Sequence, residues 1–252
     1  MDEYNTKLVH WAHKREIKVY KHLVHSPQNS NTSKPRTKYS DMDSEHKQAS
    51  DNRRKKYYLQ KEKYLIDLAI QNDLDVFITF TFAEDVTDYA KAQHEWDLFL
   101  KRMKYALKTD LKYIATYELQ KKRRVYHFHA LFNLGFLPKQ ELDALWRNGY
   151  TCIRKIPSQD RENATRYLLK YIMKDIEVEC TEGIRTSKRK IYISRTLSKP
   201  TVQKILSSKT ADDYIFENME DVSETASYPI HNHLGAKINE VDSITIKKRK
   251  EN

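Results

Sequence analysis

The sequence predicts an α+β protein in which helices pack on one face of a central antiparallel sheet of about five strands. Short runs rich in β-branched and aromatic residues alternate with longer segments whose apolar residues recur at helical spacing. A short basic segment, KKRR, joins two of the strand-like runs and indicates an antiparallel hairpin. The 252 residues suffice for one sizeable domain with extensions, or for two small domains.

The N-terminal part of the chain is predicted to be an extension of the main domain. Residues 1–25 mix apolar and basic positions, and we expect a short element there. Residues 26–52 hold almost nothing that can be buried, which is typical of a linker or of disorder. From Arg53 apolar residues recur at helical spacing. We therefore expect residues 1–52 to form a basic, partly disordered extension.

The segment 53–207 is predicted to form the main domain. One of its helices has Pro138 at its start and Gly149 past its end, and polar residues near Asp160 precede another. The tail, residues 208–252, is acidic at first and basic at its end, and we expect it to be peripheral. Helices are predicted at 53–71, 88–107, 138–149, 160–175 and 199–208, and strands at 75–82, 112–120, 125–134, 150–156 and 189–195.

The composition points to a polyanionic partner. The formal net charge is +11 and the isoelectric point is about 9.3, so nucleic acid is the first candidate. The chain has 17 tyrosines but only 4 glycines, which argues against glycine-rich nucleotide loops, and it contains no Walker-type or dinucleotide-binding motif. A basic protein of another kind has the same charge, so charge alone does not decide the function.

The cysteines and the apolar runs exclude several other classes. Cys152 and Cys180 do not form a C-x-x-C pair, so zinc-ribbon and thioredoxin-type sites are excluded and we expect two reduced thiols. No apolar run approaches the roughly 18 residues of a membrane span, and the N-terminus lacks a signal-peptide core. We expect a cytoplasmic protein without a membrane partner.

Two histidines lie one residue apart in the predicted strand 125–134. Side chains alternate along a strand, so His127 and His129 point to the same face, where they can share one metal ion. Glu118 is the candidate third ligand, because the hairpin would bring it beside them. The alternative is a pair of surface histidines on a half-exposed strand. A second pair, His231 and His233, lies among Pro, Asn and Gly, and we expect it to be in a loop without a metal role.

The predicted helix 160–175 carries two tyrosines and two lysines on one side. Tyr167, Lys170, Tyr171 and Lys174 fall within an arc of about 100°, away from the apolar side. A phenol with its usual pKa of about 10 is a poor nucleophile, but a metal ion and ammonium groups favour the phenolate. A tyrosine that attacks a phosphodiester forms a covalent phosphotyrosine. The alternative is an amphipathic helix with half-buried tyrosines beside lysines that reach into solvent.

Three segments, in this order, resemble the motifs of HUH endonucleases: FITFTF and YHFHALFN on predicted strands and YLLKYIMK on a predicted helix. The resemblance is closer to the rolling-circle replication initiator (Rep) proteins of small phages and plasmids. KRKIYISRTLSKP is similar to the segment that follows the tyrosine helix in many of them, so the resemblance covers about residues 53–207. It implies a ferredoxin-like or RRM-like antiparallel sheet backed by helices.

The resemblance also implies a chemistry. His127 and His129, with Glu118 as a less well-defined third ligand, would hold Mg²⁺ or Mn²⁺, which polarises the scissile phosphate. Tyr167 and Tyr171 match the two-tyrosine pattern, in which one tyrosine nicks and stays on the 5′ end while the 3′-OH primes synthesis. The second can cut again and transfer the strand. The pattern leaves open which tyrosine attacks first, although the Lys-Asp after Tyr171 favours Tyr171 if only one is needed.

The function implied is that of a metal-dependent, site-specific single-strand DNA endonuclease and ligase that initiates rolling-circle replication in the host cytoplasm. Its partners would be single-stranded DNA at a replication origin, a host polymerase and a host helicase, since no Walker motif follows. DNA would contact the open sheet face and the basic turn, unless that turn is merely solvated. Thr79 and Thr81 either line the site or are only good strand formers. The residues of the basic turn are Lys121, Lys122, Arg123 and Arg124.

Two other functions remain open. A transposase or relaxase would use the same nuclease chemistry on other DNA. A non-catalytic RRM-like nucleic-acid-binding protein would explain the charge, the aromatic residues and the sheet. It would not explain the histidine pair together with two Tyr-x-x-Lys repeats.

Overall fold

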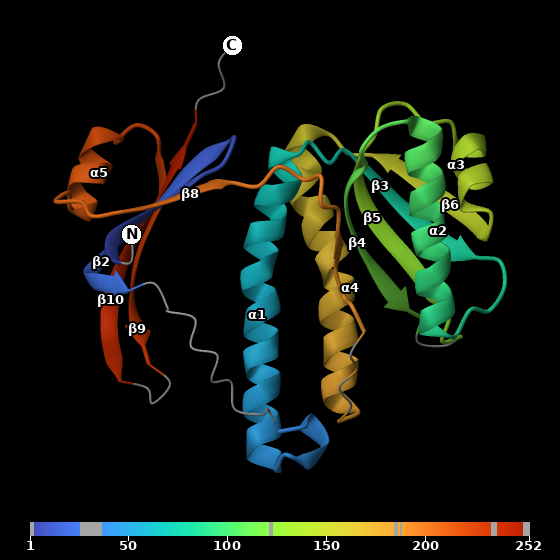
Figure 1. Ribbon diagram of the computed structural model, residues 1–252, viewed down its shortest axis with the longest axis horizontal. Coiled ribbons are helices and arrows are strands. Elements are labelled where there is room, and N and C mark those ends of the chain that lie inside the picture. The colour runs from blue at the N-terminus through green and yellow to red at the C-terminus, as the bar shows by residue number, and fades with distance from the viewer. Residues whose placement is uncertain are drawn as a thin grey trace. The chain divides into compact units, whose positions relative to one another are not determined.

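Two units, each built on its own antiparallel sheet of five strands, make up the chain in the computed structural model (Figure 1). The structure describes residues 3–25, 37–120, 123–183, 186, 188–232 and 236–248. One unit comprises Met1–Pro35 and Lys199–Asn252, and the other comprises Arg36–Ser198. Among the described residues, no helix is long and apolar enough to cross a membrane.

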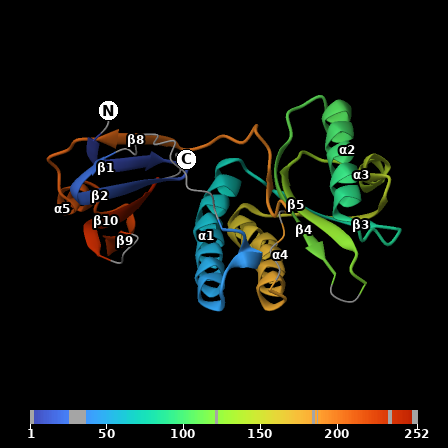
Figure 2. The same ribbon diagram turned by 60° about the horizontal axis from the view of Figure 1, so that its bottom comes forward.

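The unit formed by both ends of the chain has the strand order β8-β1-β2-β10-β9. Its strands β1, β2 and β10 lie side by side (Figure 2), and Ile17 in β2 pairs with Leu8 in β1 and with Ile244 in β10. The helix α5 places Tyr214 in a core with Ile17, Ile244 and Ile246. Its elements are β1 (Glu3–His10), β2 (Lys14–His25), β8 (Thr201–Ile205), α5 (Ala211–Glu217), β9 (Val222–His231) and β10 (Lys237–Lys247).

This unit does not follow the predicted boundaries at residues 52 and 207. Residues 3–25 form two strands of a hairpin, and the tail supplies a helix and two strands instead of a peripheral segment. The predicted helix at 199–208 is wrong, because β8 is a strand that pairs with β1. The pairing joins residues about 195 positions apart, such as Lys7 with Lys204, and local sequence patterns carry no information on such partners.

The second unit has the strand order β6-β3-β5-β4-β7 and confirms the predicted α+β class with an antiparallel sheet. Two short 3₁₀ turns, Tyr39–Asp41 and Ser158–Asp160, precede two of its helices. Its strands are β3 (Val76–Phe82), β4 (Lys112–Leu119), β5 (Tyr126–Asn133), β6 (Gly149–Lys155) and β7 (Tyr192–Ile193). Its helices are α1 (Ser44–Gln71), α2 (Tyr89–Leu107), α3 (Lys139–Trp146) and α4 (Arg161–Thr181).

The helix α1 begins earlier than predicted. Asp43 caps it by accepting a hydrogen bond from the backbone N–H of His46 at 2.8 Å. Residues 44–52, predicted as linker, form its first turns. They carry almost no apolar residues, so they give no periodic signal. The other part of the predicted linker, residues 26–36, lies outside the described residues.

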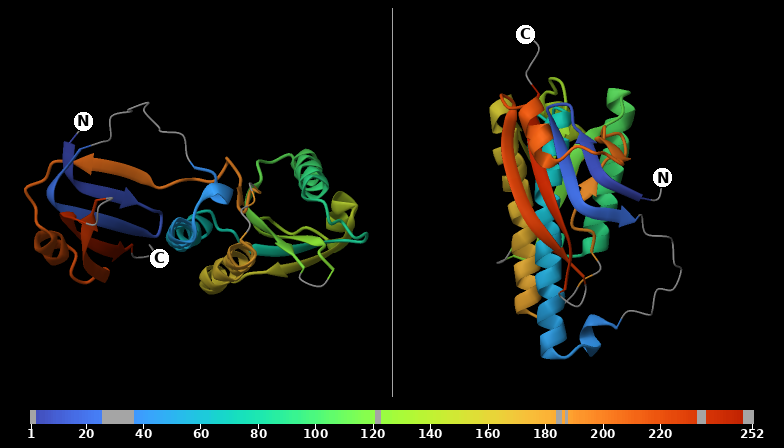
Figure 3. Two further views of the ribbon diagram at one scale, coloured as in Figure 1. Left: turned by 90° about the horizontal axis from the view of Figure 1, so that it is seen from below. Right: turned by 90° about the vertical axis from the view of Figure 1, so that its left-hand side faces the viewer.

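Helices cover both faces of the β3–β7 sheet, which corrects the prediction of one covered face (Figure 3). On one face α2 and α3 form an aromatic core with the strands, where Phe128 stacks on Trp96 with ring centroids 4.7 Å apart. Phe80 and Trp146 join the same core. On the other face α4 packs against β4 and β5, and α1 packs against α4. Because strand side chains alternate, the buried Phe128 directs its two histidine neighbours toward α4.

Gly149 at the start of β6 is required by its surroundings. Its φ is +151°, and a Cβ atom would lie 2.3 Å from the backbone oxygen of Thr81 in β3. We expect Gly149→Ala to lower the free energy of unfolding by at least about 2 kcal/mol. Gly135→Ala is the control, because nothing lies within 4 Å of its added Cβ. Urea denaturation of both variants measures the difference, and equal midpoints would contradict the expectation.

Candidate functional site

The strand register gathers the predicted site residues on one face of the sheet. Glu118 in β4 lies directly opposite His127 in β5. On the other side of β5, Thr81 is opposite His127 and Thr79 is opposite His129. Paired residues of an antiparallel ladder project to the same face, so all five side chains share the face that α4 covers.

His129 makes the most contacts with the other groups of this face. Its side chain is buried, with 4% of the residue exposed. Its Nδ1 lies 3.2 Å from the hydroxyl of Thr79, and its Nε2 lies 3.4 Å from one carboxylate oxygen of Glu118. The other carboxylate oxygen of Glu118 accepts a hydrogen bond from the Lys174 ammonium group. Thr79 therefore lines the site, in agreement with one of the two interpretations of its position.

The helix α4 brings both tyrosines to this face. The ring of Tyr171 stacks on the imidazole of His129, with centroids 3.9 Å apart and planes inclined by 4°. The Tyr171 hydroxyl donates to the Tyr167 hydroxyl at 2.6 Å. Tyr167 is 51% exposed, and its ring lies 5.7 Å from that of Phe77, a neighbour that the sequence patterns did not indicate. The phenols thus form a short chain from His129 outward to solvent.

The electrostatics of the face favour an ionised carboxylate beside a neutral imidazole. The hydrogen bond with His129 and the contacts with Lys174 lower the pKa of Glu118 to about 2. Burial, and then repulsion from His129, lower the pKa of His127, so its imidazole is a neutral donor at pH 7. Burial and the hydrogen bond with Tyr167 raise the pKa of Tyr171, so its phenol is protonated. The face therefore offers metal-binding donors, but it does not by itself activate a phenolate.

The donor types fit a divalent cation, although their present arrangement is incomplete. Two imidazoles and a carboxylate share the face, and both nitrogen and oxygen donors suit Mn²⁺. Within the part of the chain that the structure describes, no group of three or more His, Cys, Asp or Glu side chains could hold a metal ion. The ammonium group of Lys174 already binds the Glu118 carboxylate. A cation at Glu118 would have to displace it.

The remaining predicted site residues are less closely gathered. Lys170 is exposed on α4. Arg123 forms an ion pair with Asp85, away from the tyrosines. Arg124 has a φ of +56° and lines a cavity of about 240 Å³ that also touches Glu118, Tyr171 and Lys174. Lys121 and Lys122 lie outside the described residues. His231 ends β9, whereas His233 also lies outside the described residues.

A buried ionic network behind α4 was not predicted. Lys190 is 4% exposed, and its ammonium group binds the carboxylates of Asp175 and Glu179 on α4 and the hydroxyl of Tyr117 on β4. Arg54 on α1 binds the other oxygen of Glu179 at 2.6 Å. The spacing of Asp175 and Glu179, four residues apart, was the available signal, since it places both on one side of a helix. The network ties α4 to β4 beside Glu118.

Loss of Lys190 is expected to destabilise the unit strongly. Lys190→Met leaves two carboxylates without their buried cation, so we expect the free energy of unfolding to fall by about 3–5 kcal/mol at pH 7. Lys101→Met, on the exposed side of α2, is the control and should change it by less than about 0.5 kcal/mol. Chemical denaturation measures both, and a loss no larger than that of the control would contradict the role of the network.

The pH dependence of that loss has a defined sign. Burial raises the pKa of Glu179, but hydrogen bonds from Lys190, Thr186 and Arg54 outweigh it and lower the pKa below 4.5. A depressed pKa contributes stability above pH 4.5, and this contribution disappears as the pH falls through the pKa of the folded state. The difference between the wild type and Lys190→Met should therefore narrow in acid. A difference that stays constant down to acid unfolding would contradict this.

One family of known proteins matches this part of the chain. Residues 75–176 match the model of a family described as Replication-associated protein, of the ORF2 type. The matched segment runs from the residue before β3 into α4 and includes both site histidines, Glu118 and both tyrosines. The match confirms the resemblance to replication proteins for this segment. No curated protein and no solved structure matches the chain.

Proposed function

We propose, from the replication-associated segment 75–176, that the chain is a metal-dependent, site-specific single-strand DNA endonuclease and ligase that initiates rolling-circle replication. The observation that carries the proposal is the stacking of Tyr171 on His129, beside Glu118 and within hydrogen-bonding distance of Tyr167. A metal-binding donor set and two candidate nucleophiles thus meet at one point of the fold. A protein that only binds nucleic acid would not need this juxtaposition.

The proposed reaction is an exchange of phosphodiester bonds. The phenolic oxygen of one tyrosine forms a bond to the scissile phosphorus, and the bond from phosphorus to the 3′ oxygen breaks. The 5′ phosphate remains on the tyrosine, and the 3′ oxygen takes up a proton to become a 3′-OH. In the reverse direction a 3′-OH attacks the phosphotyrosine and restores a DNA strand, which is the ligase activity. No external energy source is needed, because one phosphodiester replaces another.

Tyr171 is proposed as the first nucleophile. It stacks on His129, and its hydroxyl already donates its hydrogen to Tyr167, which is half exposed. The proton lost by Tyr171 would pass through the Tyr167 hydroxyl to water. Tyr167 would serve as the second nucleophile at the end of the replication round. Lys174 would offset charge on the phosphate, and Lys170 is placed on the exposed side of the same helix.

His127, His129 and Glu118 would hold the divalent cation, either Mg²⁺ or Mn²⁺. When bound, the cation would polarise the scissile phosphate and favour the attacking phenolate. The ionised Glu118 and the neutral His127 are in the protonation states that metal ligands require. Binding of the cation at Glu118 would release Lys174, which then becomes free to contact the DNA phosphate.

A covalent-adduct assay tests the proposal. The full chain is incubated with Mn²⁺ and single-stranded DNA that carries the origin of the replicon encoding it, and the products are separated under denaturing conditions. We expect a protein–DNA adduct and a free 3′-OH, and we expect neither when EDTA is present. Adduct formation that persists in EDTA would contradict the metal proposal, and cleavage of the origin strand without an adduct would contradict the tyrosine proposal.

A further inference from the structure

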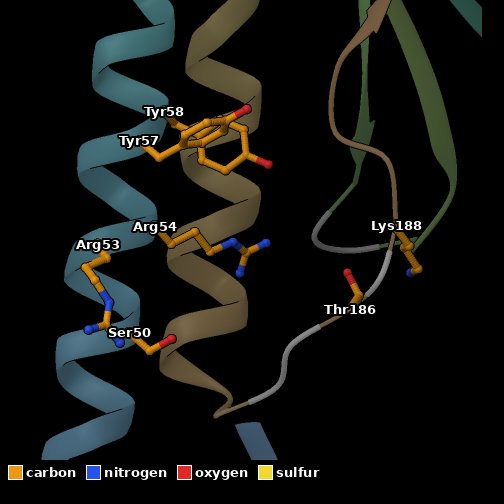
Figure 4. A pocket seen from close by; sticks show the side chains of 7 residues that line it. All are labelled: Ser50, Arg53, Arg54, Tyr57, Tyr58, Thr186 and Lys188. Atoms are coloured by element: carbon orange, nitrogen blue, oxygen red, sulfur yellow. The ribbon is translucent and has the colours of Figure 1, made fainter. Parts of the chain in front are cut away.

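A basic and aromatic cavity lies on the other side of α4 from the proposed catalytic face. Its volume is about 450 Å³, which lies within the usual range of ligand sites. Figure 4 shows side chains of α1 on one side of it and of the segment after α4 on the other. The lining residues are Ser50, Arg53, Arg54, Tyr57, Tyr58, Thr186 and Lys188.

The helical spacing of α1 arranges basic and aromatic side chains in two neighbouring rows. Arg53 and Tyr57 are four residues apart, and so are Arg54 and Tyr58. The rings of Tyr57 and Tyr58 meet edge to face with centroids 5.2 Å apart, and Tyr57 is 51% exposed. The pairing with Tyr58 restrains Tyr57 while leaving much of its surface open. A restrained, exposed ring beside cations suits the stacking of a nucleic-acid base.

The charges of the cavity are not balanced. Arg54 is paired with Glu179, which Lys190 also contacts. Lys188 donates to the Tyr126 hydroxyl at 2.7 Å and lies 5.5 Å from the ring of Tyr89, both uncharged. Arg53 is exposed and forms no ion pair within the described residues. None of the described residues that line the cavity is acidic. Arg53 and Lys188 are thus available to an anionic ligand.

The contacts of the cavity place it close to the proposed reaction. Glu179, the partner of Arg54, follows Tyr171 by eight residues on α4, or about 12 Å along the helix axis. Tyr126, the partner of Lys188, directly precedes His127 in β5. A strand with its scissile phosphate at Tyr171 needs only a few nucleotides to span such a distance.

We propose that this cavity binds one nucleotide of the single DNA strand that flanks the scissile phosphate. Arg53 and Lys188 contact its phosphate, and its base stacks on Tyr57. The inference rests on the proposed function, because the strand is the one that the tyrosines cleave. It assigns a DNA-contacting role to α1, which lies outside the matched segment 75–176.

Equilibrium binding of a fluorescently labelled single-stranded oligonucleotide to the full chain tests the aromatic contact. Tyr57→Leu is expected to weaken binding about tenfold, and Tyr57→Phe is expected to bind like the wild type, because it keeps the ring. Tyr105→Leu is the matched control: Tyr105 is 86% exposed on α2 and lies among Lys101, Lys104 and Lys108. It should bind normally. Equal losses from Tyr57→Leu and Tyr105→Leu would overturn the proposal.

The salt dependence of the same binding tests the phosphate contact. Arg53→Gln should reduce the slope of log K against log salt by about 0.7, the value for one phosphate of a single strand, whereas Arg53→Lys should preserve it. An unchanged slope in Arg53→Gln would overturn the contact. Inorganic phosphate and thymidine monophosphate are tested as competitors. If either one displaces the oligonucleotide at its own low concentration, the cavity takes a free anion and not a strand.

Parallel measurement of the covalent adduct separates this inference from the proposed function. Binding that depends on Tyr57 and Arg53 without any adduct would support the cavity and contradict the nuclease. An adduct from wild-type protein, together with binding that is insensitive to both residues, would overturn the cavity and leave the nuclease standing. Tyr57 and Arg53 are exposed, so the variants are expected to fold, and their melting curves verify this.

Discussion

Tyr171→Phe is expected to lower the rate of covalent adduct formation by more than about a thousandfold, because it removes the oxygen that attacks the phosphate. The ring remains, so its stacking on His129 at 3.9 Å should be retained and the fold should be unaffected. Only the hydroxyl that donates to Tyr167 is lost. Quantification of the adduct at fixed time points, with Mn²⁺ in excess, measures the effect.

The companion variants identify the role of each phenol. Tyr167→Phe should still form an adduct, but it should fail to transfer the strand in a second cleavage. The double variant Tyr167→Phe, Tyr171→Phe should form none. Tyr105→Phe, on the exposed surface of α2, should behave like the wild type. A double variant that still forms the adduct would show that the nucleophile lies elsewhere.

His129→Phe is expected to abolish Mn²⁺ binding at the site and to lower adduct formation by more than about a hundredfold. The substitution keeps an aromatic ring against Tyr171 but removes the nitrogen donors that face Thr79 and Glu118. The loss would therefore report on the donors and not on the packing of α4. Electron paramagnetic resonance of bound Mn²⁺ measures the first effect, and the adduct assay measures the second.

The control for this variant is His94→Phe, which changes an exposed histidine of α2. It should bind Mn²⁺ and react like the wild type. His127→Ala should resemble His129→Phe, since both imidazoles belong to the proposed donor set. Normal Mn²⁺ binding by His127→Ala and by His129→Phe would contradict the metal site.

Local patterns were sufficient to predict the core of this site. A short connection between β4 and β5 limits the register, so the sequence already placed Glu118 near His127. Helical spacing likewise put Tyr167 and Tyr171 on one side of α4. These inferences need only the periods of strands and helices and the length of one loop.

Other features depend on contacts that local patterns do not encode. The covering of the histidine face by α4 is a tertiary arrangement, and so is the binding of Asp175 and Glu179 by Lys190 from a later segment. The unit formed by the two chain ends requires pairing across most of the sequence. Its β9 is exposed at nearly every position, so it lacks the hydrophobic alternation that would identify a strand.

The central claim is that a tyrosine of α4 becomes covalently linked to DNA beside the two histidines of β5. Peptide mapping of the purified adduct by mass spectrometry, after digestion of the protein and the DNA, tests it most directly. We predict that the 5′-phosphonucleotide is found on the peptide that contains Tyr167 and Tyr171, with Tyr171 carrying it in the first cleavage. A modification on any residue outside α4 would contradict the claim.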